Sequence, residues 1–196
     1  ESLMAARFTQ VGKLLLILVG GAVPGCLHCF HPTPEAPREQ VEAAKQFPTP
    51  ARDRVYLFLL NGVDPLEVAN LSGVREYINC LGFGKVYYGQ LYHTHWYLEE
   101  MRRIRAECPE SRFVVVGFEY GAEAAKKLVE KAGGEGIDVD ELIYLEPQGI
   151  GSLAIEAGPH CRKTLTIQAT RWLGDPVAPA GSESIVLPHA SRLGVP

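Results

Sequence analysis

Residues 112–121, Arg-Phe-Val-Val-Val-Gly-Phe-Glu-Tyr-Gly, constrain the fold of this chain more than any other stretch. The run from Phe113 to Val116 contains β-branched and aromatic residues, which is typical of a buried strand. Gly117 and Gly121 follow this run, and after them apolar residues recur at helical spacing. The sequence therefore predicts a strand, a tight turn and a helix in direct succession. The two glycines let the chain pack closely around Glu119 at the tip of this turn.

The composition fits one soluble α/β domain preceded by a leader. The chain has 196 residues, of which 46% are hydrophobic and 21% are charged, as in ordinary globular domains. The formal net charge of -4 gives no reason to expect nucleic acid or an anionic membrane surface as a partner. The 5 cysteines are scattered along the chain and odd in number, so they do not predict a dense disulfide framework.

The first 25 residues read as a signal peptide or membrane anchor. Arg7 and Lys13 precede a short apolar run over 14–19, and small residues follow it, which is the pattern of a secretory signal. The run is short for a bilayer span. Val-Pro-Gly-Cys ending at Cys26 resembles a bacterial lipobox, which implies lipidation of Cys26; the alternative is an uncleaved signal anchor. We therefore expect an exported protein that is membrane-anchored or periplasmic, with membrane contact through this segment only.

Residues 26–53 are predicted to be a proline-rich linker, with a short helix over 39–46. The cysteines and histidines between Cys26 and His31 resemble a metal cluster, because zinc takes four such ligands. Their spacing is closer than in common zinc fingers, so we expect no metal there.

Residues 54–196 are predicted to form the folded domain. Apolar runs predict strands over 55–60, 85–90, 113–116, 142–145, 164–169 and 184–187. Periodic apolar stripes predict helices over 68–81, 97–108 and 122–132, the first of them started by Asp64-Pro65. This alternation indicates an α/β fold with a doubly wound, mostly parallel sheet.

The domain resembles the α/β-hydrolase superfamily over roughly residues 54–196. The segment Gly117-Phe-Glu-Tyr-Gly121 has the spacing of the family's Gly-x-Ser-x-Gly nucleophile elbow, with Glu119 at the serine position. Leu173 to Pro179 resembles the segment that carries the family's acid, and His189 follows the last predicted strand. The resemblance implies a three-layer sandwich, and we expect it to lack the family's final helix.

The resemblance also implies roles for particular residues. Glu119, Asp175 and His189 would be the catalytic positions in the family's chain order. Backbone N–H groups of Gly62, Val63 and Tyr120 would form the oxyanion hole. Glutamate has no hydroxyl to activate and places negative charge beside an anionic intermediate. We therefore expect no serine-hydrolase activity, and a binding or scaffold role instead. The alternative is an active hydrolase in which Glu119 is a carboxylate nucleophile, as the aspartate is in haloalkane dehalogenases and epoxide hydrolases.

The sequence also offers alternative residues for the acid, the histidine position and the nucleophile. Glu146 is an alternative acid, and Arg192 an alternative occupant of the histidine site. His93 and His95 could line the cleft or bind a metal, although a surface loop with aromatic packing is favoured. A hydrolase with another serine would use Ser152, Ser182 or Ser184, none of which has elbow context. We expect no cofactor and no metal, and a small-molecule ligand in the cleft as the partner.

Overall fold

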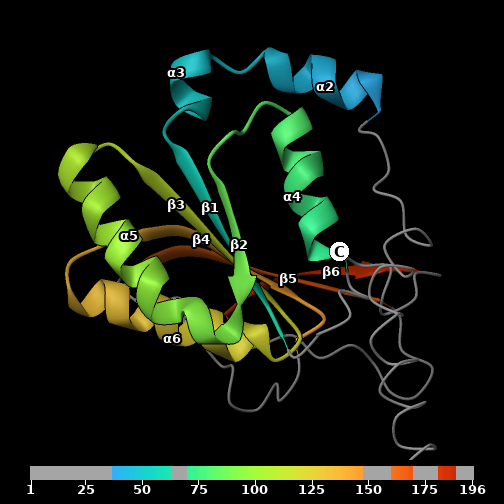
Figure 1. The fold of residues 1–196 in the computed structure, drawn as a ribbon. Coiled ribbons are helices and arrows are strands. Elements are labelled where there is room, and N and C mark those ends of the chain that lie inside the picture. The colour runs from blue at the N-terminus through green and yellow to red at the C-terminus, as the bar shows by residue number, and fades with distance from the viewer. Residues whose placement is uncertain (1–36, 63–69, 148–159, 170–180, 189–196) are drawn as a thin grey trace, which may run out of the picture.

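The computed structural model describes residues 37–62, 70–147, 160–169 and 181–188, which form one α/β unit (Figure 1). The strands are β1 (Val55–Asn61), β2 (Val86–Gln90), β3 (Arg112–Phe118), β4 (Val139–Leu145), β5 (Cys161–Ala169) and β6 (Glu183–Leu187). The helices are α2 (Arg38–Lys45), α3 (Thr49–Arg52), α4 (Leu71–Cys80), η1 (Leu91–His93), α5 (Thr94–Glu107) and α6 (Gly121–Gly134).

The strands form a 6-stranded sheet in the order β2-β1-β3-β4-β5-β6. Each pairing in the described residues is parallel. Helix α4 lies on one face of the sheet, and α5 with α6 lies on the other (Figure 1). The predicted fold class is confirmed: this is a doubly wound α/β sandwich of three layers. In the sheet, β2 lies on one side of β1, and β3 to β6 lie on the other side. The direction in which successive strands are added therefore reverses between β1 and β3.

Alternating residues of the central strands supply two cores. Phe58 of β1 and Phe113 of β3 face α5 and α6 and are fully buried. They pack there with Tyr97 and Met101 of α5 and with Leu128 of α6. The hydroxyl of Tyr97 donates to the carbonyl oxygen of Leu59 at 3.1 Å, which satisfies this polar group inside the core.

The opposite core is smaller and lies under α4. Leu59 and Val116 point to this face, where they pack with Leu71 at the start of α4. Successive side chains of a strand point to opposite faces, so neighbouring apolar residues serve both cores. This is why β1 and β3 appear in the sequence as nearly continuous apolar runs.

Helix α4 does not begin where the sequence predicted. It starts at Leu71, after Asn70 in the left-handed backbone conformation with φ 52°. The predicted start at Asp64-Pro65 is therefore wrong for α4, although residues 63–69 themselves lie outside the described ranges. Asp64-Pro65 is a good helix-opening pair, but the left-handed backbone of Asn70 prevents a continuous helix from extending back through position 70.

The described part of the predicted linker contains α2 and α3. The predicted short helix over 39–46 corresponds to α2. The hydroxyl of Tyr77 on α4 donates to Gln40 of α2, and Lys85 Nζ donates to the carbonyl oxygen of Asp53 at 2.5 Å. Residues 37–53 therefore contact the rest of the α/β unit. None of the helices in the described ranges is long and apolar enough to span a bilayer.

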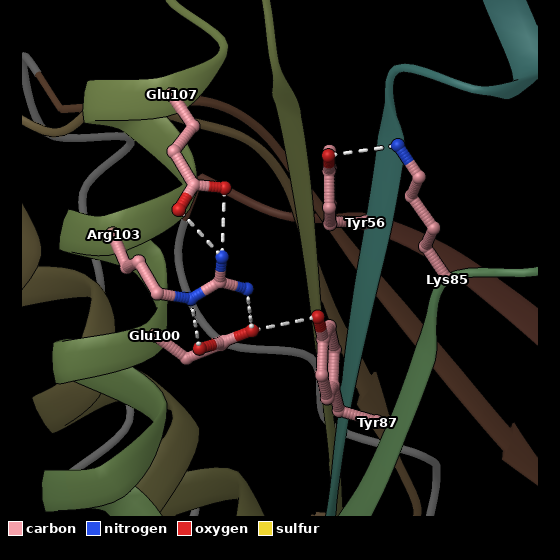
Figure 2. Close-up of polar contacts among 6 residues, drawn as sticks. All are labelled: Tyr56, Lys85, Tyr87, Glu100, Arg103 and Glu107. Carbon is pink, nitrogen blue, oxygen red and sulfur yellow. Dashed lines mark hydrogen bonds and ion pairs between the residues drawn. The ribbon is translucent and has the colours of Figure 1, made fainter.

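Helix α5 is tied to β2 by a polar network (Figure 2). Glu100 accepts a hydrogen bond from the hydroxyl of Tyr87 at 2.9 Å. Arg103 donates to both carboxylate oxygens of Glu100, at 2.9 and 2.6 Å, and also to Glu107. Hydrogen bonds from the Arg103 guanidinium are the main reason that the pKa of Glu100 is lowered. Glu100 thus remains a charged hydrogen-bond acceptor that joins α5 to β2 through Tyr87.

Candidate functional site at the carboxyl edge of the sheet

Glu119 stands on the corner between β3 and α6. Its φ of 50° lies in the left-handed region, which costs a residue other than glycine about 1–2 kcal/mol. Its N–H donates to the carbonyl oxygen of Leu145 at 3.0 Å, and its carbonyl accepts from the N–H of Ala122 at 3.1 Å. Glu119 is half-buried. Strain of this kind in a non-glycine residue is often found at functional sites.

The glycines on either side of this corner are required by close packing. A Cβ on Gly117 would lie 2.6 Å from the Cα of Ala122, at the start of α6. A Cβ on Gly121 would collide with the carbonyl oxygen of Leu60 at the end of β1. The turn is therefore pressed against both the following helix and the neighbouring strand. This is the arrangement that the sequence predicted for residues 117–121.

Gly62 lies beside the same corner. A Cβ on Gly62 would be 3.2 Å from the backbone nitrogen of Tyr120, so two of the predicted oxyanion-hole residues are neighbours. The N–H of Gly62, however, donates to the side-chain oxygen of Asn61 at 2.9 Å. A ligand oxygen at this position would have to compete with Asn61. Val63, the third predicted donor, lies outside the described residues.

Polar side chains extend the site along the strand ends toward β2. Asn61 is fully buried, and its amide donates to the hydroxyl of Tyr88 at 3.3 Å. Gln90 donates to the same hydroxyl at 3.4 Å. In the sequence, Asn61 is simply the residue that follows the predicted strand over 55–60. Its signal was a polar residue directly after an apolar run, at the sheet edge where parallel folds bind ligands.

Glu146 forms a second corner, one strand further along. Its φ is 45°, and its N–H donates to the carbonyl oxygen of Ile167 at 3.0 Å. The carboxylate is buried and accepts the N–H of Ala169 at the end of β5. The carboxylate of Glu146 therefore binds the backbone of β5, which gives this buried group a structural role.

The segment η1 adds aromatic groups and a histidine near this edge. It follows β2 and contacts α6. His93 accepts the N–H of Gln90 through Nδ1 at 2.9 Å, so the neutral ring carries its proton on Nε2. The side chains of Tyr92 and Trp96 are 71% and 52% exposed, and Tyr120 beside the corner is 58% exposed.

Metal binding by these histidines gains no support from their surroundings. His95 lies on α5, 3.9 Å from Glu99, and its side chain is 85% exposed. In the ranges that the structure describes, no group of three or more histidine, cysteine, aspartate or glutamate side chains could hold a metal ion.

Several predicted residues fall outside the described ranges. They are Cys26, Ser152, Asp175, His189 and Arg192. Of the alternative serines, Ser182 accepts a hydrogen bond from Thr166 at 3.0 Å, and Ser184 lies within β6. Neither occupies a corner between a strand and a helix. Glu119 with Gly62 and Tyr120 is therefore the part of the predicted site that the structure brings together.

Comparison with known proteins gives one similar structure. No family model matches the chain, and no curated protein matches it. A solved structure described as a predicted CIB-like hydrolase from Thermoplasma acidophilum is 17% identical, with a TM-score of 0.46. The match covers 70% of this chain and 77% of that one.

The position of the corner in the sheet indicates what it can do. Ligands of open α/β sheets bind outside the carboxyl ends of the strands, where the strand order reverses. Here that point lies between β1, which ends at Asn61, and β3, which ends before Glu119. The site can therefore present a carboxylate, a backbone N–H and neighbouring aromatic groups to a bound molecule.

Proposed function

We propose that this chain is an α/β-hydrolase-like protein that binds a small molecule at the corner around Glu119 and has no serine-hydrolase activity. The observation that carries the proposal is the left-handed backbone of Glu119, φ 50°, between a strand and a helix. A residue in this conformation, flanked by glycines in close contact with β1 and α6, fits a nucleophile elbow. The side chain at its tip is a carboxylate.

The chemistry of the side chain argues against acyl transfer through residue 119. A serine hydrolase needs a hydroxyl that a histidine can deprotonate, and a pocket that stabilises an oxyanion. Glu119 supplies no such hydroxyl and adds negative charge next to the N–H of Tyr120. The same carboxylate favours a ligand that presents a positive charge or a hydrogen-bond donor. Exposed Tyr92 and Trp96 suit the same class, since aromatic faces attract cations.

The test is hydrolysis of p-nitrophenyl acetate and p-nitrophenyl butyrate by the purified protein. We expect the wild type and the variant His189→Ala to release p-nitrophenol at the same rate, close to that of buffer. Turnover that is present in the wild type and lost in His189→Ala would overturn the proposal, since it would require an active nucleophile served by that histidine.

A second function is favoured by the position of Glu119 at the corner itself. A carboxylate there can attack a carbon that carries a halide or an epoxide oxygen, which forms an alkyl ester and releases the halide or opens the ring. Water activated by His189, with Asp175 orienting the ring, would then hydrolyse the ester. The extra methylene of glutamate relative to aspartate shifts the attacking oxygen by about an ångström, which can cost about a hundredfold in rate.

This second function has its own measurement. The variant His189→Ala is incubated with 1-bromobutane or styrene oxide, and the peptide that contains residue 119 is analysed by mass spectrometry. The carboxylate-nucleophile mechanism requires an alkyl adduct on Glu119, because the step that removes it is blocked. An unmodified peptide with both reagents would exclude this mechanism and favour binding without catalysis.

We further propose that the apolar segment over 14–19 directs export and that Cys26 is lipidated. The support is the order of charged, apolar and small residues before Cys26. Metabolic labelling with a palmitate analogue in a bacterial host tests this, with Cys26→Ser as the comparison. Equal labelling of the two proteins, or none, would contradict lipidation at Cys26.

A further inference from the structure

A cavity of about 340 Å³ lies at the opposite edge of the sheet from Glu119. It is formed where β1 and β3 begin, next to α3 and the turn before β2. Its volume falls in the ordinary range of small-molecule sites. The lining residues are Phe47, Ala51, Arg52, Arg54, Val55, Phe83, Glu110 and Arg112.

The walls of this cavity carry an excess of positive charge. Three arginines and one glutamate line it, although the chain as a whole has a net charge of -4. Within the part of the chain that the structure describes, no carboxylate forms an ion pair with Arg52, Arg54 or Arg112. Acidic side chains on α5 and β4 are instead paired with other basic residues, such as Glu107 with Arg103, Asp140 with Arg162 and Glu141 with Lys163.

The guanidinium of Arg52 is only partly hydrogen-bonded to the described residues. Its Nη2 lies 3.5 Å from the hydroxyl of Thr49, a long contact that leaves the group weakly bound. Its Nε is buried and has no hydrogen-bond partner among the described residues. Arg52 also lines the cavity, so its guanidinium adds positive charge to this wall.

Arg54 and Arg112 are positioned by the sheet. The N–H of Arg112 donates to the carbonyl oxygen of Arg54 at 2.8 Å, where β1 and β3 start side by side. Both side chains are exposed. Two guanidinium groups from adjacent strands can converge on one anion, and arginine is well suited to phosphate because its donors form a planar fork.

Apolar groups complete the cavity. Phe47 follows α2, is 61% exposed and lines the cavity. Phe83 lines the same cavity from the turn before β2. The site therefore combines an anion-binding wall with aromatic surface.

We propose that this cavity binds a phosphomonoester that carries an apolar or aromatic group. Three arginines and one glutamate leave two positive charges in excess, and a phosphomonoester carries about -1.5 to -2 at neutral pH. Phe47 and Phe83 contact the apolar part of the ligand, and the arginines contact the phosphate. The site is separate from the corner at Glu119, because it lies at the amino ends of the strands rather than at their carboxyl ends.

The test is isothermal titration calorimetry of the full chain with phenyl phosphate, inorganic phosphate and phenol. We expect phenyl phosphate to bind most tightly of the three. Arg54→Gln and Arg112→Gln should each weaken its binding about tenfold or more, since each removes a charge-assisted hydrogen bond. Arg38→Gln is the matched control: it removes the same charge from an exposed position on α2 outside the cavity and should leave binding unchanged.

A second arm distinguishes a soluble ligand from a lipid headgroup. Phosphatidylcholine vesicles with and without 20% phosphatidic acid are mixed with the wild type and with Arg112→Gln, and bound protein is measured by flotation. Additional binding that depends on phosphatidic acid and is lost in Arg112→Gln assigns the site to a lipid headgroup. Tight binding of phenyl phosphate without that dependence assigns it to a soluble ester. No binding in either arm, or equal loss in Arg38→Gln and Arg112→Gln, overturns the proposal.

Discussion

Glu119 donates its backbone N–H to the carbonyl oxygen of Leu145, at 3.0 Å, at the point where β3 and β4 end together. One strand further, Glu146 donates to Ile167 in the same way and at the same distance. Both glutamates have positive φ, 50° and 45°. Strands β3 and β4 thus each end on a corner that is fixed by a hydrogen bond to the neighbouring strand. The geometry at residue 119 is therefore set by the sheet and not by the loop alone.

The left-handed backbone of Glu119 predicts which substitutions this position tolerates. Glu119→Val should lower the free energy of unfolding by about 1–3 kcal/mol, because β-branched residues fit the left-handed region poorly. Glu119→Asn removes the same carboxylate but adopts this conformation readily, so its loss should stay within about 0.5 kcal/mol. Urea denaturation of both variants measures the difference. Equal stabilities would contradict the left-handed conformation.

The buried contact of Glu146 predicts a structural role for its carboxylate. Glu146→Leu leaves the N–H of Ala169 without its acceptor and should cost about 1–3 kcal/mol. Glu146→Gln keeps an acceptor oxygen and should cost clearly less. Chemical denaturation again provides the measurement. If the two substitutions are equally costly, charge rather than the hydrogen bond to β5 is what stabilises this strand end.

Close packing at Gly121 predicts a contrast within a single helix. Gly121→Ala places a methyl group against the carbonyl oxygen of Leu60 and should cost about 1–3 kcal/mol. Gly134→Ala, at the other end of α6, meets open space and should stabilise the protein by up to about 1 kcal/mol. Thermal unfolding of the two variants should shift in opposite directions. A neutral Gly121→Ala would show that β1 and the turn are not in contact.

The network in Figure 2 predicts a dependence of stability on alkaline pH. Burial, followed by the hydrogen bond to Glu100, raises the pKa of Tyr87 from 10.0 to about 12. The folded state therefore keeps this proton at pH values where the unfolded chain loses it, so stability falls as pH rises from 10 to 12. Tyr87→Phe should reduce the steepness of that fall. An unchanged pH profile in Tyr87→Phe would exclude this tyrosine as the source.

Much of the fold could be predicted because β1 and β3 are apolar on both faces. Their runs contain no helical period, so they indicate strands covered by helices on each side. The corner at Glu119 was also predictable, since Gly117 and Gly121 mark it in the sequence. The corner at Glu146 was not, because no glycine stands beside it and its conformation is imposed by hydrogen bonds to β5.

Two other features depend on contacts that the sequence does not reveal. The start of α4 is set by the left-handed Asn70, whereas Asp64-Pro65 has the stronger local signal for a helix start. The arginine-lined cavity joins residues from α3, from the turn before β2 and from the starts of two strands. No motif links Arg54 with Arg112, and only the register of β1 against β3 brings them together.

The most direct test of the central claim is the reaction of residue 119 with a fluorophosphonate, which labels serines at active nucleophile elbows. Intact mass spectrometry would compare the wild type, Glu119→Ser, and Glu119→Ser combined with His189→Ala. The account predicts no label on the wild type, one label at residue 119 in Glu119→Ser, and loss of that label in the double variant. Labelling of the wild type at any serine, or no label on folded Glu119→Ser, would contradict it.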